Sequence, residues 1–274
     1  MWGMIKPCIL ALLAAPLIFG SGQSVRAQNY EDAITAELLP GWRQADGSHV
    51  AAVRMVLKEG WKTYWRAPGD GGIPPQLRWA GSRNMQQIEV IWPTPTVFDQ
   101  NGLQSLGYLQ EVVVPLIVAP TRAGRDISLN ARLDIGVCKE ICVPETLRIK
   151  ARLPEENTKI DPMIAAALAE RPYSAQEAGV QRVACKISAN PEGLSVSADI
   201  QMPSAGGREF AVIETDNPEL WVAQADANRR GATLSVSSDV YHVEDQPFLL
   251  SRDALRFTVL GQNYAVDIHG CQAG

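Results

Sequence analysis

Two cysteines four positions apart, Cys138 and Cys142, constrain the fold most, because they stand in a stretch rich in β-strand residues. Along a straight strand their Cα atoms would lie about 13 Å apart, whereas a disulfide needs about 4.4–6.8 Å. The chain must therefore turn between them if they pair. A disulfide that closes so short a loop removes little entropy from the unfolded chain. The spacing favours redox exchange or metal binding over a purely structural bridge.

The N-terminus has the pattern of a secretory signal peptide, which we place at residues 1–27. Lys6 precedes an apolar run over residues 9–19, and Val25-Arg26-Ala27 fits a small-x-small cleavage site. The apolar run is too short for a membrane-spanning helix, and no later run approaches that length. We expect an exported protein whose mature chain begins near Gln28 and does not span a membrane.

The four cysteines that follow the predicted signal peptide are expected to form two bridges, because an exported protein with an even number of cysteines usually pairs them. Three connectivities are open to Cys138, Cys142, Cys185 and Cys271. Proximity favours Cys138 with Cys142, which leaves Cys185 with Cys271. The second bridge closes a loop of more than 80 residues, and such a loop gives a much stronger constraint on the unfolded chain. We predict that it is structural.

Short strands separated by Gly, Pro, Asn and Asp dominate the chain, which is typical of antiparallel sandwiches. One segment differs: Asp161-Pro162 has the form of a helix start, with an N-cap and a proline in the first turn, and Pro172 ends the segment. The sequence predicts an all-β fold of two immunoglobulin-like antiparallel β-sandwiches joined by a short helix. The expected domains are a redox domain (28–154), a helical linker (155–175) and a second immunoglobulin-like domain (176–274).

Composition excludes several functional classes. Lys and Arg number 25 against 30 Asp and Glu, without a basic stripe, so nucleic acid is not an expected partner. The three histidines stand in no hydrolase motif. A thioredoxin-type enzyme would carry Cys-x-x-Cys at a helix start, whereas here three residues separate the cysteines and strands flank them. We expect no cofactor.

The immediate neighbours of the cysteine pair indicate a disulfide of moderate oxidising strength. Lys139 favours the thiolate of Cys138 and Glu140 opposes it, and no helix start is expected there to activate the thiol strongly. Gly136 in the preceding strand would permit close approach of another backbone or of a partner's loop. These features predict a disulfide that passes electrons to partners rather than a powerful oxidant.

An aromatic and glycine-rich block extends from residue 60 to residue 75. Its tryptophans, Trp61 and Trp65, are expected in the core, which is the usual place of Trp in a small sandwich. The alternative is a binding groove formed with Trp79 and Trp92.

Several segments together resemble the N-terminal periplasmic part of DsbD-type thiol:disulfide interchange proteins, and in particular the ScsB-like branch, in which two immunoglobulin-like domains precede the membrane part. The resemblance is specific over about residues 35–155 and weaker beyond. The segments that carry it are Gly60–Pro75, Trp92-Pro93-x-Pro95, Gly107-Tyr108, Val112-Val113-Val114-Pro115-Leu116 and Val137-Cys138-x-x-x-Cys142-Val143-Pro144.

The resemblance implies that Cys138 and Cys142 are the catalytic pair of a periplasmic protein-disulfide reductase or exchange component. Such a domain receives electrons from a membrane-embedded domain and passes them to oxidised periplasmic thiol proteins. A cap loop covers the pair in this family, and the candidates here are Phe98, Leu103 and Tyr108. DsbD itself has a longer spacing between its cysteines. Because the sequence shows no membrane helices or thioredoxin-like domain, we expect a separate membrane electron carrier as partner.

Two alternatives remain open at this point. Closely spaced cysteines also suit Cu(I), a soft ion that selects thiolates, and the ScsB-like branch is linked to copper tolerance. Met55 or His269 could complete such a site, although the sequence places neither near the pair, and we assign no metal ligand. The other alternative is a non-catalytic adaptor sandwich whose disulfide is structural.

Overall fold

The structure, a computed structural model, describes residues 33–100 and 103–274, together with Trp2. The chain divides into residues 1–30 and a compact unit, residues 31–274, to which the following account applies. The predicted signal peptide and the predicted start near Gln28 lie outside the described residues, apart from Trp2. Among the described helices, none is long and apolar enough to cross a membrane.

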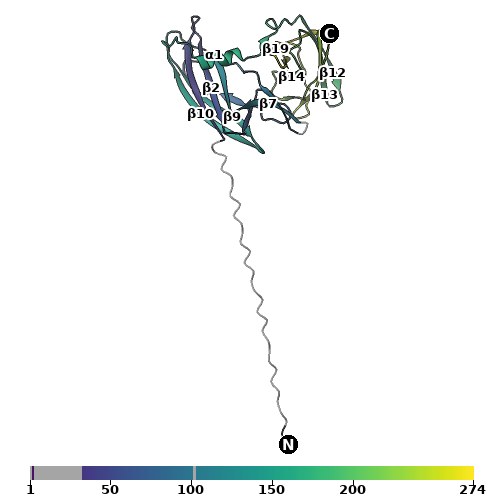
Figure 1. The fold of residues 1–274 in the computed structure, drawn as a ribbon, viewed down its shortest axis with the longest axis horizontal. Coiled ribbons are helices and arrows are strands. Elements are labelled where there is room, and N and C mark those ends of the chain that lie inside the picture. Colours follow the sequence, from purple (N-terminus) through teal and green to yellow (C-terminus); the bar gives the residue numbers. More distant parts are fainter. Residues whose placement is uncertain (1, 3–32, 101–102) are drawn as a thin grey trace. The chain divides into compact units, whose positions relative to one another are not determined.

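The N-terminal half of the compact unit is an antiparallel β-sandwich (Figure 1). One of its sheets has the strand order β1-β2-β8-β5. The other has the order β10-β9-β3-β7-β6, with β4 paired to β9. The strands of the first sheet are β1 (Ile34–Arg43), β2 (His49–Leu57), β8 (Glu111–Ala119) and β5 (Gln87–Val90). Those of the second are β10 (Cys142–Leu153), β9 (Ile127–Cys138), β3 (Lys62–Tyr64), β7 (Leu103–Leu109), β6 (Thr96–Gln100) and β4 (Gln76–Arg78).

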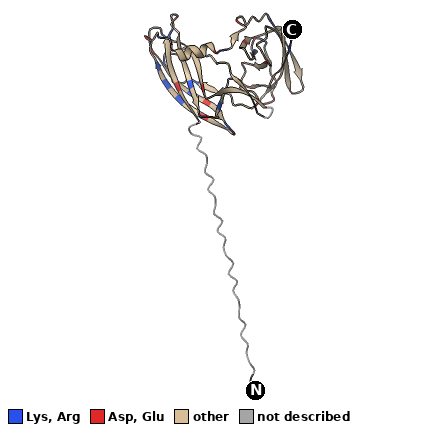
Figure 2. Ribbon diagram, viewed as in Figure 1, with Lys and Arg blue, Asp and Glu red and all other residues tan. Residues whose placement is uncertain are grey.

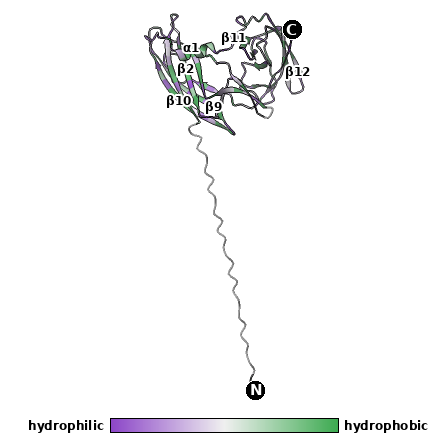
Figure 3. Ribbon diagram, in the orientation of Figure 1, coloured by the Kyte–Doolittle hydropathy of each residue, from purple (hydrophilic) through white to green (hydrophobic). Residues whose placement is uncertain are grey.

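Alternation along β9 shows why this half folds as a sandwich. Every second side chain from Ile127 to Val137 is buried, at 3% exposure or less, as expected where one face of a strand packs on a core. Its neighbour β10 alternates between exposed and half-buried residues. Figure 2 shows charged residues spaced along these strands, and Figure 3 shows the corresponding alternation in hydropathy. The predicted sandwich is therefore confirmed, and so is the alternation of buried and exposed side chains on which the prediction was based.

A short helix lies between the two sandwiches along the chain and begins as predicted. Helix α1 (Pro162–Ala169) has Asp161 as its N-cap, whose Oδ1 accepts from the backbone N–H groups of Met163 and Ile164 at 2.9 and 3.3 Å. Ile164 and Ala167 are buried and belong to a hydrophobic cluster with residues of β2 and β8. The buried face thus holds the helix on the first sandwich, and the cap stabilises its first turn.

The C-terminal half is a second sandwich, and its sheets have the orders β11-β19-β18-β14 and β15-β17-β13-β12-β20, with β16 paired to β17. Most pairs are antiparallel, and the two-residue strands β11 and β20 add parallel pairs. Strand β11 lies within the predicted linker. The strands are β11 (Tyr173–Ser174), β12 (Arg182–Asn190), β13 (Gly193–Gln201), β14 (Phe210–Glu214), β15 (Leu220–Val222), β16 (Asp226–Arg230), β17 (Thr233–His242), β18 (Arg256–Leu260), β19 (Ala265–His269) and β20 (Gln272–Ala273).

A disulfide joins the two ends of this second sandwich. Cys185 in β12 bonds to Cys271, which lies directly before β20, across a separation of 86 residues. Next to the bridge, the N–H of Gly274 donates to the carbonyl of Cys185 at 3.0 Å. The C-terminal segment is therefore held to β12 by covalent and hydrogen bonds together.

Candidate functional site

The cysteine pair closes the hairpin between β9 and β10. In the antiparallel register Cys142 stands directly opposite Cys138, and the Cα atoms lie 4.1 Å apart in the disulfide-bonded pair. The turn consists of Lys139, Glu140 and Ile141, and the N–H of Lys139 donates to the carbonyl of Ile141 at 3.2 Å. The chain thus turns between the cysteines, as their spacing requires. Directly opposed residues of antiparallel strands are close enough for their side chains to bond.

The two sulfur-bearing residues differ in their access to solvent. Cys138 is 2% exposed, because its strand β9 lies between β10 and β3. Cys142 is exposed, and it begins β10 at the end of the strand order. Beside it, Ile141 is 54% exposed. Cys142 is therefore the more accessible residue of the pair, whereas Cys138 is shielded.

A buried tyrosine hydroxyl contacts both sulfur atoms. Tyr64, the last residue of β3, is 1% exposed. Its hydroxyl donates to Cys138 Sγ at 2.8 Å, and lies 3.2 Å from Cys142 Sγ and 3.2 Å from the carbonyl of Gly71. Burial raises the pKa of the Tyr64 hydroxyl. The group therefore keeps its proton and acts as a hydrogen-bond donor to sulfur.

A buried lysine lies on the same face of β3. Lys62 stands opposite Cys138 in the β3–β9 register and is 5% exposed. Its Nζ donates to Ser105 Oγ at 3.0 Å and lies 5.0 Å from the centre of the Phe98 ring and 5.7 Å from that of Tyr64. Burial lowers the pKa of Lys62, because it disfavours the charged ammonium. Lys62 thus connects the hairpin β6–β7 to the strand that carries Tyr64.

The three predicted cap residues take different places in or near this hairpin. Phe98 in β6 is half-buried against the Lys62 ammonium. Leu103 begins β7 and is 59% exposed. Tyr108 is buried, and its hydroxyl donates to the carbonyl of Pro93 at 2.8 Å. Of the three, Phe98 contacts Lys62, which stands opposite Cys138 in the sheet, while Tyr108 is buried and hydrogen-bonded to Pro93.

Two glycines allow the close packing of strands around the pair. A Cβ on Gly107 in β7 would lie 2.0 Å from the carbonyl oxygen of Thr63 in β3. A Cβ on Gly136 in β9 would lie 2.6 Å from the Cβ of Ile73. The close approach expected at Gly136 is thus made by a side chain of the same protein. A larger residue at Gly107 would press on the backbone of β3, which carries Tyr64, and a larger residue at Gly136 would press on the Ile73 side chain.

The tryptophans of the aromatic block belong to the core. Trp65 is fully buried and Trp61 is 9% exposed, whereas Trp79 and Trp92 are half-buried. In the described part of the chain, no group of three or more His, Cys, Asp or Glu side chains is arranged to hold a metal ion. Met55 is buried in β2, and His269 lies beside Asp267 in the second sandwich.

The sequence alone did not identify Tyr64 and Lys62 as site residues, because only the flanking tryptophans stand out in their segment. A signal was present: Lys62-Thr63-Tyr64 alternates between two tryptophans, and its outer residues share one face of a short strand. What the sequence does not contain is the pairing of that strand with β9.

Comparison with known proteins agrees with this geometry. The family described as "Thiol:disulfide interchange protein DsbD, N-terminal" matches residues 35–154. The N-terminal periplasmic domain of ScsB from Proteus mirabilis has a similar fold, with a TM-score of 0.61 at 23% identity over 88% of this chain and 92% of that one. A protein of unknown function from Porphyromonas gingivalis W83 covers 86% of this chain and 99% of its own, but its TM-score of 0.21 at 12% identity supports no inference.

Comparison with curated protein sequences gives no match. The family match covers the first sandwich and contains both cysteines of the hairpin, and the similarity to the ScsB domain extends over both sandwiches. Residues 35–154 therefore match the DsbD N-terminal family, and the fold of the chain is similar to that of the N-terminal periplasmic domain of ScsB.

Proposed function

We propose that this protein is a periplasmic thiol–disulfide exchange module, in which Cys138 and Cys142 are the redox pair. The observation that carries the proposal is the asymmetry of the pair: Cys142 is exposed, while Cys138 is buried and accepts a hydrogen bond from Tyr64 at 2.8 Å. An exchange disulfide needs one sulfur that a partner can reach and another that can leave as a stabilised thiolate.

Cys142 is proposed as the sulfur that is attacked, because it is the exposed residue of the pair. A partner thiolate bonds to Cys142 Sγ, the Cys138–Cys142 bond breaks, and Cys138 leaves as a thiolate that takes up a proton. A second thiolate of the partner then attacks the partner's sulfur in the mixed disulfide, and Cys142 leaves as a thiolate that also takes up a proton. The partner leaves as a disulfide, and two electrons and two protons have been added to the cysteine pair. The reverse sequence reduces an oxidised thiol protein.

Tyr64 stabilises the leaving group in this scheme. A thiolate is a much stronger hydrogen-bond acceptor than a disulfide sulfur, and hydrogen bonds to charged groups contribute about 1.5–3 kcal/mol. The donor is already in place in the oxidised protein, 2.8 Å from Cys138 Sγ. The hydroxyl therefore favours departure of Cys138 over departure of the exposed cysteine.

Phe98 is proposed as the cap residue, because it packs on Lys62, which stands opposite Cys138 in the sheet. Leu103, exposed in the same hairpin, would contribute to the outer surface that meets a partner. The partners we propose are a separate membrane electron carrier and periplasmic thiol–disulfide proteins. This assignment follows from the family of the first sandwich and from the periplasmic origin of the ScsB domain.

Single-cysteine variants test the proposal. Cys138→Ser leaves the exposed Cys142 as a free thiol, which should react rapidly with an aromatic disulfide probe and remain as a stable mixed disulfide. Cys142→Ser leaves the buried Cys138, which should react much more slowly. Incubation with a periplasmic extract should trap disulfide-linked partners on the Cys138→Ser protein.

The Cys185→Ser/Cys271→Ser protein is the matched control, since it removes a disulfide but leaves the hairpin intact. Under conditions in which its second sandwich remains folded, it should retain a Cys138–Cys142 bridge that dithiothreitol reduces at the rate of the unaltered protein. Equal reactivity of the two single-cysteine variants, together with no trapped partner, would contradict the exchange proposal and favour an adaptor with a structural disulfide.

A further inference from the structure

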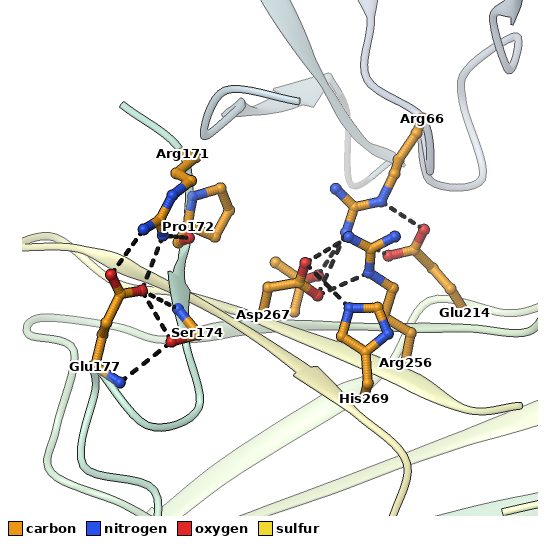
Figure 4. Close-up of polar contacts among 10 residues, drawn as sticks. Arg66, Arg171, Pro172, Ser174, Glu177, Glu214, Arg256, Asp267 and His269 are labelled. Carbon is orange, nitrogen blue, oxygen red and sulfur yellow. Dashed lines mark hydrogen bonds and ion pairs between the residues drawn. The ribbon is translucent and has the colours of Figure 1, made fainter. Parts of the chain in front are cut away.

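A buried ion network joins the segment that follows Tyr64 to the second sandwich (Figure 4). Arg66 has only 12% of its side chain exposed, and its Nε and Nη2 donate to the two carboxylate oxygens of Glu214 at 2.9 and 3.0 Å. Nη2 also donates to Thr258 Oγ1 at 3.0 Å and lies 3.8 Å from Asp267 Oδ1. Arg66 thus binds β14, β18 and β19 together.

The network is charge-balanced inside the interface. Asp267 also accepts from Arg256 Nε at 2.7 Å, so two guanidinium groups face two carboxylates, and His269 lies 3.6 Å from Asp267 at the exposed rim. Burial lowers the pKa of Arg66, and the neighbouring Glu214 opposes that effect. Removing one partner of such a buried pair leaves the other charge uncompensated, so the position of Arg66 depends on Glu214.

The segment anchored by Arg66 reaches the redox hairpin by two routes. The first route is the tyrosine: its hydroxyl also donates to the carbonyl of Gly71 at 3.2 Å, a contact that holds the Tyr64 oxygen beside the sulfur atoms. The second is the β6–β7 hairpin: the N–H of Leu106 donates to Pro68, and that of Trp65 donates to Leu106, both at 2.9 Å. The Arg66 guanidinium itself lies 3.9 Å from the centre of the Trp65 ring.

We propose that Arg66 is a positioning residue for the redox site. The second sandwich holds Arg66, and with it residues 65–72, through Glu214, Asp267 and Thr258. These residues set the Tyr64 hydroxyl against Cys138 and fix strand β7 of the β6–β7 hairpin. In this view the second sandwich tunes the chemistry of the first and is more than a spacer. The role in thiol–disulfide exchange rests on the proposed function. The contacts themselves do not, because they are made within this chain.

The test measures the pKa of the Cys138 thiol from the ultraviolet absorbance of its thiolate. The Cys142→Ser protein is titrated, and the Cys138→Ser/Cys142→Ser protein is subtracted to remove every other group. Adding Glu214→Gln should raise the pKa of Cys138 by roughly 0.4–1.5, the size of ordinary couplings between packed sites. A purely electrostatic effect has the opposite sign, because loss of a negative charge favours the thiolate and lowers that pKa.

A double-mutant cycle separates positioning from general loosening. In a Tyr64→Phe background, Glu214→Gln should have no further effect on Cys138, since the hydroxyl that it positions is absent. Glu209→Gln is the matched control: it breaks the buried Glu209–Arg229 pair within the second sandwich, where Glu209 has 4% of its side chain exposed, and it should leave the pKa of Cys138 unchanged.

Thr258→Val covers the case in which Glu214→Gln fails to fold. Valine has nearly the shape of the fully buried threonine, and the change leaves Glu214 and Asp267 in place while it removes one hydrogen bond from Arg66. It should also raise the pKa of Cys138. An unchanged or lowered pKa in the folded variants overturns the proposal. The exchange function would be unaffected by that result, because the single-cysteine trapping experiment tests it separately.

Discussion

Replacing Tyr64 by Phe is expected to raise the pKa of the Cys138 thiol in the reduced protein. The change removes one oxygen that lies 2.8 Å from Cys138 Sγ, from a side chain that is 1% exposed. Water cannot easily replace the donor at such a site. A hydrogen bond to a charged group contributes about 1.5–3 kcal/mol, and about 1.36 kcal/mol corresponds to one pKa unit. The expected rise is therefore roughly 1–2.

The measurement is the ultraviolet thiolate titration of Cys138 in the Cys142→Ser protein, with and without Tyr64→Phe. Tyr108→Phe is the matched control, because Tyr108 is also buried and hydrogen-bonded but donates to the carbonyl of Pro93. It should leave the Cys138 thiol unchanged. A pKa that stays constant or falls on Tyr64→Phe, in a protein that remains folded, refutes the role given to the hydroxyl.

Two further predictions concern stability. The Cys185–Cys271 bridge closes 86 residues, so Cys185→Ala/Cys271→Ala should lower the free energy of unfolding of the second sandwich by about 4–5 kcal/mol, measured by urea unfolding; an unchanged midpoint excludes a structural role. His49 is fully buried, its Nε2 lies 2.6 Å from the Pro40 carbonyl, and burial lowers its pKa. Because the unfolded chain binds the proton more readily, stability should be full above about pH 6.5 and fall at lower pH, and His49→Gln should flatten this dependence in urea titrations at pH 5 and 7.

The fold was predictable because its signals are local. Alternating residues from Ile127 to Val137 identify a half-buried strand in any context. Asp161-Pro162 identifies the start of the helix, where both the cap and the proline act within one turn. The disulfide-bonded pair at the β9–β10 turn lies in the hairpin that its spacing requires.

The rest of the site depends on contacts between distant segments. Strand β3 has three residues, too few for a periodic pattern, and its pairing with β9 brings Tyr64 to sulfur atoms 74 and 78 positions further along the chain. The Arg66–Glu214 contact spans 148 positions. Nothing in the composition of either segment specifies the other, so such contacts emerge only when the sheets are assembled.

The antiparallel register of the hairpin has a consequence for the mixed-disulfide intermediate of the proposed exchange. Strands β9 and β10 are paired along their full lengths from Cys142↔Cys138 to Leu153↔Ile127, so the ladder persists when the sulfur–sulfur bond is cut. The freed Cys138 then remains beside Cys142 at the high effective concentration of a tethered group. A mixed disulfide on Cys142 is consequently short-lived in the unaltered protein, since Cys138 can expel a partner that fails to complete the reaction.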